Sequence, residues 1–247
     1  MFAMQAVLDY RERVLEAGAL TEEELAWIER LMNVPDYIWI QGVQISTALT
    51  NLSIRHDYGL WPESIYREYV FVMNLTDGDI EQLSYMVNLS SLTLAFQQIS
   101  DVTPLARLLN LRSLWLGGNQ INDITPLAGL TNLSFLRLSW NYIEDLEPLS
   151  KLTSLSTLML EGNQISDVAH LADLPNLTRL ALSSNYISDI VPLKGLTNLT
   201  GLYLNGNQIS DIAPLAGLTN LTELNLERNH ITDWSPVAHV EIVHGRP

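Results

Sequence analysis

Residues 199–220 read LTGLYLNGNQISDIAPLAGLTN, and this 22-residue pattern recurs along most of the chain. Each copy follows approximately the pattern LxxLxLxxNxIxDIxPLxxL, in which x is variable. Seven successive copies begin at Leu89, Leu111, Leu133, Leu155, Leu177, Leu199 and Leu221. A fixed period of this length indicates similar structural units stacked in a row, because one such unit is too small to bury its own apolar residues.

The spacing of the leucines predicts the structure of each unit. In LxxLxL the second and third leucines, such as Leu114 and Leu116, alternate with outward residues, which is the period of a β-strand with one buried face. Successive copies of this strand are expected to stack in parallel. A period of 20–29 residues with this leucine spacing is typical of a leucine-rich repeat.

Two polar positions recur in the pattern, and each has a structural role. The asparagine follows the strand, where its amide can satisfy backbone groups that the sheet no longer pairs. It stands at Asn119, Asn141, Asn163, Asn185, Asn207 and Asn229, with Gln97 in the first copy, where we expect a weaker bond. The aspartate can cap a short helical turn, and a proline three residues later favours that turn in every copy except the one with His170. It stands at Asp101, Asp123, Asp145, Asp167, Asp189, Asp211 and Asp233.

The chain before the clear copies is different. Residues 1–36 predict two helices, the second beginning at a capping box of Thr21 and Glu24 and ending at Pro35. Residues 37–69 are β-rich and contain an irregular insertion at 56–67, where Trp61 and Tyr66 are weaker candidates for binding. A degenerate first repeat then begins at residue 70, since Val70 and Val72 lie 22 residues before Leu92 and Leu94.

The stretch from Asp211 to Leu221, which reads DIAPLAGLTNL and is followed by Asn229 and Ile231, resembles the 22-residue repeats of the internalin family and related bacterial proteins. The resemblance covers about residues 75–237. It implies a shallow curved solenoid with a parallel β-sheet on the concave side and 3₁₀ turns on the convex side. It also implies that a protein partner binds the concave face and that the N-terminal helices form a cap.

These observations predict an α/β fold, a right-handed leucine-rich-repeat solenoid with a parallel concave β-sheet, convex 3₁₀ turns and an N-terminal α-helical cap. The expected segments are a helical cap at 1–36, a β-rich cap segment with an insertion at 37–69, the solenoid at 70–237 and a closing segment at 238–247. The solenoid would consist of one degenerate and seven clear repeats.

Composition excludes several classes of function. The formal net charge of −15 argues against nucleic acid and anionic membranes, which need a basic surface. The chain has no cysteine, so disulfides and zinc–thiolate sites are excluded. No run of 18 apolar residues predicts a membrane span, and the N-terminus lacks the pattern of a signal peptide. We expect either a cytoplasmic protein or, if this chain is a fragment of an exported protein, a location at the bacterial surface or outside the cell.

Strand residues between the buried leucines would face the concave side, and those just after the strand lie beside it. Aromatic, methionine and arginine side chains there are the types enriched in binding hot spots. We therefore predict a partner-binding surface of Trp115, Phe135, Arg137, Trp140, Tyr142, Met159, Arg179 and Tyr203. The alternative is lateral packing between neighbouring strands, with Arg137 lying over Trp115 as a cation–π pair.

Nothing in the sequence predicts catalysis, a metal or another cofactor. The segment His239 to His244 lacks the HExxH spacing of a metal-binding helix, and the repeated aspartates lack the close carboxylate alternation of a calcium loop. We expect a monomeric, non-catalytic module that binds a protein partner and belongs to a bacterial surface or secreted protein. Two alternatives stay open: an intracellular scaffold or regulatory subunit, similar to leucine-rich phosphatase regulators, and a structural spacer in a larger chain.

Overall fold

The computed structural model describes residues 37–40, 43–46, 49, 51–55, 70–72 and 75–246. The chain forms two compact units, Met1–Ala48 and Leu49–Pro247. In the first, strands β1 (Tyr37–Ile40) and β2 (Val43–Ser46) pair as an antiparallel hairpin. The helices predicted in residues 1–36 and the insertion at 56–67, with Trp61 and Tyr66, lie outside the described residues.

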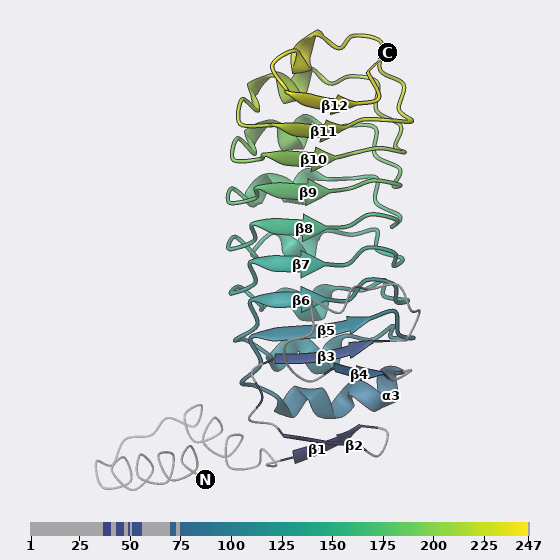
Figure 1. The fold of residues 1–247 in the computed structure, drawn as a ribbon, viewed down its shortest axis with the longest axis vertical. Coiled ribbons are helices and arrows are strands. Elements are labelled where there is room, and N and C mark those ends of the chain that lie inside the picture. Colours follow the sequence, from purple (N-terminus) through teal and green to yellow (C-terminus); the bar gives the residue numbers. More distant parts are fainter. Residues whose placement is uncertain are drawn as a thin grey trace, which may run out of the picture. The chain divides into compact units, whose positions relative to one another are not determined.

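The second unit is built on one ten-stranded sheet in the order β12-β11-β10-β9-β8-β7-β6-β5-β3-β4 (Figure 1). All neighbours in it are parallel. The strands are β3 (Asn51–Arg55), β4 (Val70–Val72), β5 (Ser91–Ala95), β6 (Ser113–Trp115), β7 (Phe135–Arg137), β8 (Thr157–Met159), β9 (Arg179–Ala181), β10 (Gly201–Tyr203), β11 (Glu223–Asn225) and β12 (Ile242–His244). From β5 to β11 each residue pairs with the residue 22 positions on, as Leu114 does with Leu136. The predicted parallel sheet is confirmed.

Short helical turns connect the strands on the side of the unit away from the sheet. They are α3 (Asp77–Ile80), η2 (Glu81–Tyr85), η3 (Thr103–Arg107), η4 (Thr125–Leu127), η5 (Glu147–Leu149), η6 (Ala169–Asp173), η7 (Val191–Gly195), η8 (Ala213–Gly217) and η9 (Ser235–Val237). In each of the seven clear repeats the aspartate carboxylate accepts a bond from the first backbone N–H of the 3₁₀ turn, as Asp123 does from Thr125 at 2.8 Å. Asp167 does the same for Ala169 at 2.8 Å, although His170 replaces the proline there. The capping role predicted for the aspartates is confirmed.

The core lies between the sheet and the turns. The leucines and isoleucines of the pattern are almost completely buried, Leu114, Leu136 and Leu158 being 0% exposed. Buried asparagines tie each repeat to the preceding one. Asn163 accepts from the Ile143 N–H at 3.1 Å and donates to the carbonyls of Leu138 and Leu160, both at 3.0 Å. The predicted role of these asparagines is confirmed.

The start of the sheet differs from the 22-residue pattern. From the spacing alone, Val70 and Val72 in β4 would pair with Leu92 and Leu94 in β5. Instead, β3 lies between β4 and β5, and Leu52 of β3 pairs with Leu92. The rest of the degenerate repeat keeps its register, because Thr76 forms a parallel bridge with Gln98, 22 residues later. Gln97, at the asparagine position of the first clear repeat, also bonds to the backbone. It accepts from the Leu75 N–H at 2.7 Å and donates to the Ala95 carbonyl at 3.0 Å. Between β4 and β5 the sheet therefore contains a strand, β3, that the repeat pattern does not include.

At the other end, the predicted closing segment at 238–247 contains strand β12, which pairs in parallel with β11. Within the described residues, no helix combines the length and the apolar character needed to cross a membrane.

Candidate protein-binding surface

The outward residues of strands β6 to β11 form a surface that we call the sheet face. Six of the eight predicted binding residues belong to it: Trp115, Phe135, Arg137, Met159, Arg179 and Tyr203. They alternate with buried leucines and are partly or well exposed. The strand period therefore places their side chains outward, as the sequence predicts.

Three of these residues form an aromatic cluster on β6 and β7. The rings of Trp115 and Phe135 stack with centroids 5.1 Å apart and planes 20° apart. The guanidinium carbon of Arg137 lies 5.6 Å from the centre of the Trp115 ring. This is the lateral packing and cation–π contact foreseen from the sequence. The contacts hold the cluster in one arrangement and leave it partly exposed.

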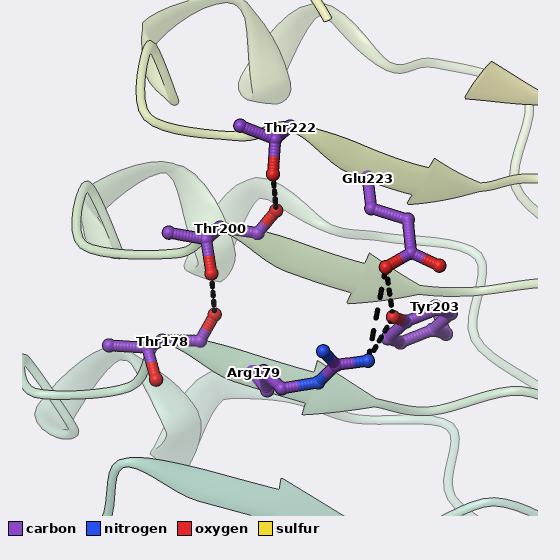
Figure 2. Close-up of polar contacts among 6 residues, drawn as sticks. All are labelled: Thr178, Arg179, Thr200, Tyr203, Thr222 and Glu223. Carbon is purple, nitrogen blue, oxygen red and sulfur yellow. Dashed lines mark hydrogen bonds and ion pairs between the residues drawn. The ribbon is translucent and has the colours of Figure 1, made fainter. Parts of the chain in front are cut away.

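A second, polar group lies on β9 to β11. Figure 2 shows Arg179 donating to the Tyr203 hydroxyl, which in turn donates to a Glu223 carboxylate oxygen at 2.6 Å. The Arg179 guanidinium also lies 3.9 Å from that oxygen and 5.3 Å from the centre of the Tyr203 ring. Partial burial, followed by the bond to Glu223, raises the pKa of Tyr203 above its ordinary value.

Gly201 lies between the members of this polar group. It occupies the strand position that Arg179 holds in the preceding repeat and Glu223 in the following one. A methyl group on Gly201 would lie 3.5 Å from Tyr203 and 3.7 Å from Arg179. A methyl group would make only ordinary contacts, whereas a longer side chain would crowd Arg179 and Tyr203. The small residue therefore leaves space over β10 for the contact between Arg179 and Glu223. The repeated Ser and Thr before the strands also join neighbours, as Thr200 and Thr222 donate to the carbonyls of Thr178 and Thr200 (Figure 2).

The other two predicted residues, Trp140 and Tyr142, follow β7 and lie beside the sheet face. Counting the first leucine of a repeat as position 1, they are at positions 8 and 10. Both are exposed, at 57% and 54%. The structure thus divides the predicted set into a strand group and a group on the adjoining flank.

Position 8 has a left-handed backbone in every repeat, but glycine occupies it only in alternate ones. The glycines are Gly118, Gly162 and Gly206, and the other residues are Phe96, Trp140, Ser184 and Arg228. A methyl group on Gly118 or Gly162 would lie 2.4 or 2.3 Å from the ring of Phe96 or Trp140. Each ring therefore packs on the glycine of the next repeat.

This alternation makes the structural unit 44 residues long, twice the 22-residue period. The residue before position 8 follows the same rule: Ser139 donates to Glu161, and Ser183 donates to Asn205 at 2.5 Å. A comparison of each repeat with the second repeat after it, rather than with the next one, would have revealed this alternation from the sequence.

Other kinds of site are not evident in the described part of the chain. It contains no group of three or more histidine, aspartate or glutamate side chains placed to hold a metal ion. One open depression lies on the flank, lined by Asn122, Asp123, Tyr142, Glu144, Asp145 and Gln164. The surface therefore offers aromatic, cationic and anionic groups for contact with another molecule.

Comparison with known proteins agrees with this architecture. The family model for leucine-rich repeats (two copies) matches residues 109–151, 131–173, 153–195 and 197–239. No curated protein matches the sequence. The chain is 40% identical to an internalin (inlF) from Listeria monocytogenes, with a TM-score of 0.69 over 73% of this chain and 54% of that one. It is thus matched to about half of that protein's length.

Two further structures are similar. An internalin C2 (inlC2) from Listeria monocytogenes is 38% identical, with a TM-score of 0.64 over 69% of this chain and 76% of that one. The leucine-rich-repeat ectodomain of a plant receptor kinase, GASSHO1/SCHENGEN3 from Arabidopsis thaliana, shares the fold at 24% identity, with a TM-score of 0.61 over 70% of this chain and 23% of that one. The chain belongs to the leucine-rich repeat family, and its repeats are of the internalin type.

Proposed function

We propose that this protein is a non-catalytic recognition module that binds a protein partner on the sheet face. The observation that carries the proposal is the ordered cluster of Trp115, Phe135 and Arg137, which is held by stacking and remains partly exposed. Tryptophan and arginine are enriched in binding hot spots, and side chains already fixed in place lose less entropy on binding. Met159, one strand further, can adapt to the partner's shape.

The polar group of Arg179, Tyr203 and Glu223 would add specificity on the same face. Its charges are only partly shielded from water, the side chains of Arg179 and Glu223 being 51% and 37% exposed. A partner that covers them must supply matching hydrogen bonds, since unpaired buried charges are costly. The fold itself is compatible with such a role, because the Arabidopsis ectodomain was solved in complex with CASPARIAN STRIP INTEGRITY FACTOR 2.

We further propose that the module acts at the bacterial surface or in secreted form, on the strength of its likeness to two Listeria internalins. Its partner would then lie outside the cell. Extracts of host-cell surfaces and bacterial lysates are therefore the two sources to compare.

The test is affinity capture with the wild type and with a Trp115→Ala, Phe135→Ala, Arg137→Ala triple variant. We expect the wild type to retain a protein that the triple variant loses. A control with Leu109→Ala and Val191→Ala removes two exposed apolar side chains, 55% and 47% exposed, that lie outside the strands. It should retain the partner.

Melting temperatures accompany the capture experiment, because loss of the stacked rings could lower stability. Equal capture by a triple variant that is as stable as the wild type would contradict binding at this cluster. A stable triple variant that loses the partner, beside a control that keeps it, supports the proposal.

A further inference from the structure

The flank beside the sheet face carries a column of rings that recurs every second repeat. Position 10 holds Tyr142, Tyr186 and His230, and the repeats between them hold glutamine. Both tyrosines are more than half exposed, at 54% and 57%. Trp140 packs on Gly162, whereas Tyr142 lines the open depression on this flank. The tyrosines therefore offer ring surface that internal packing does not consume.

Carboxylates lie alongside these rings. Position 13 is an exposed aspartate in all seven repeats, and Glu144 stands at position 12 of the repeat that carries Tyr142. Positions 10, 12 and 13 contain no lysine or arginine in any of the seven repeats. Bonds from the Thr125 side chain and backbone lower the pKa of Asp123, which keeps that carboxylate ionised. At these three positions the charged groups are thus all carboxylates beside aromatic rings, and the ligand of this part of the flank should be cationic.

The spacing of the rings limits the shape of that ligand. Neighbouring parallel strands lie about 4.8 Å apart, so rings two repeats apart are spaced by about 9.6 Å. A polyproline II helix repeats every three residues and rises about 3.1 Å per residue, which gives about 9.3 Å per turn. An extended peptide of this kind, laid along the stack of repeats, would place equivalent residues opposite successive rings. Proline rings pack well on aromatic side chains.

We propose that this surface, which we call the tyrosine flank and define by Tyr142, Tyr186, His230, Glu144 and the position-13 aspartates, binds a basic, proline-rich peptide segment in the polyproline II conformation. Prolines contact the two tyrosines, and one lysine or arginine side chain lies among Asp123, Glu144 and Asp145. The carboxylates supply charge complementarity, and cation–π contact with Tyr142 adds to it. This site is separate from the sheet face and differs from it in the chemistry of its partner.

The experiment measures fluorescence anisotropy of a labelled (Pro-Pro-Arg)₄ peptide on the full chain. We expect saturable binding that weakens as salt is raised, since exposed charges are screened. Tyr142→Ala with Tyr186→Ala should weaken binding at least about tenfold, as expected when aromatic hot-spot residues are truncated. The control with Leu109→Ala and Val191→Ala should bind as the wild type does. Circular dichroism and melting temperature verify that both variants fold.

Two further peptides separate shape from charge. (Ala-Ala-Arg)₄ keeps the charges and loses the polyproline preference, and (Pro-Pro-Glu)₄ keeps that preference and reverses the charge. Both should bind at least about tenfold more weakly, since each loses one of the two contacts that the flank supplies. Equal binding of the alanine peptide would overturn the proposal in favour of charge attraction alone.

The sheet-face triple variant separates this inference from the proposed function. Loss of the peptide in that variant, with retention in the tyrosine variant, would move the peptide to the sheet face and overturn the flank site. Loss only in the tyrosine variant supports the flank site, whatever the sheet face is found to bind.

Discussion

The buried asparagines show how much one side chain does in each repeat. Asn163 is 6% exposed and bonds to backbone groups of its own repeat and of the one before. These groups lie where the strand has ended, so no strand neighbour can satisfy them. The sequence predicts this role correctly, because a short amide side chain that recurs at a turn is well placed to bond to the backbone of that turn.

Replacing Asn163 by alanine should therefore destabilise the fold. We expect a loss of about 2–6 kcal/mol, because two buried backbone groups lose their partners at about 1–3 kcal/mol each. The measurement is urea unfolding followed by circular dichroism. Asn176→Ala is the matched control, since Asn176 is exposed and water can replace its bond to the Thr153 carbonyl. Equal losses in the two variants would contradict the structural role of the buried amide.

The 22-residue pattern predicts contacts between residues 22 positions apart, but it does not predict contacts that span two repeats. Trp115 and Arg137 pair in register on adjacent strands, so their cation–π contact follows from the period. The link from Arg179 through Tyr203 to Glu223 depends on the empty space above Gly201 and on the direction in which Tyr203 points. A one-repeat pattern contains neither piece of information.

At the level of elements, the repeats act in pairs. The large side chains at position 8 adopt a left-handed backbone at Phe96 and Trp140, which costs about 1–2 kcal/mol for a residue with a Cβ atom. Contact of each ring with the following glycine offsets part of that cost. The glycine thus has two roles: it adopts a left-handed backbone at little cost, and it leaves space for the ring of the preceding repeat.

Gly162→Ala tests this pairing. We expect a loss of about 2–4 kcal/mol, because the new methyl group is forced into a left-handed backbone and against the Trp140 ring. Gly129→Ala is the control, since a methyl group there meets nothing within 4 Å. Denaturant midpoints are compared, together with those of a Trp140→Ala, Gly162→Ala double variant, which should recover part of the loss. A Gly162→Ala protein as stable as the control would refute the packing argument.

The start of the sheet marks the limit of periodicity as a guide to structure. Ile80, Leu83 and Met86 keep the 22-residue register and are buried, but β3 occupies the place beside β5 that this register assigns to β4. Asn51–Arg55 has the alternation of a strand and no recognisable repeat around it. A periodic pattern can identify the copies, but it cannot identify a strand that belongs to none of them.

For the solenoid as a whole, stability is approximately a sum over repeats and their interfaces. Two deletions of equal length should therefore have unequal effects. Removing residues 155–176 brings Trp140 against Ser184, whereas removing 177–198 leaves Trp140 on Gly162. We expect the first deletion to be less stable by about 1–3 kcal/mol because of overpacking. Urea unfolding of both proteins measures the difference, and equal midpoints would argue against it.

The pairing of Trp140 with Gly162 also governs how such a protein can change its length. Gain or loss of one internal copy breaks the alternation of glycine with larger residues at position 8, whereas gain or loss of two adjacent copies keeps it. The length of this array is therefore expected to drift among relatives in even steps, and a designer who lengthens it should copy residues 133–176 as one block.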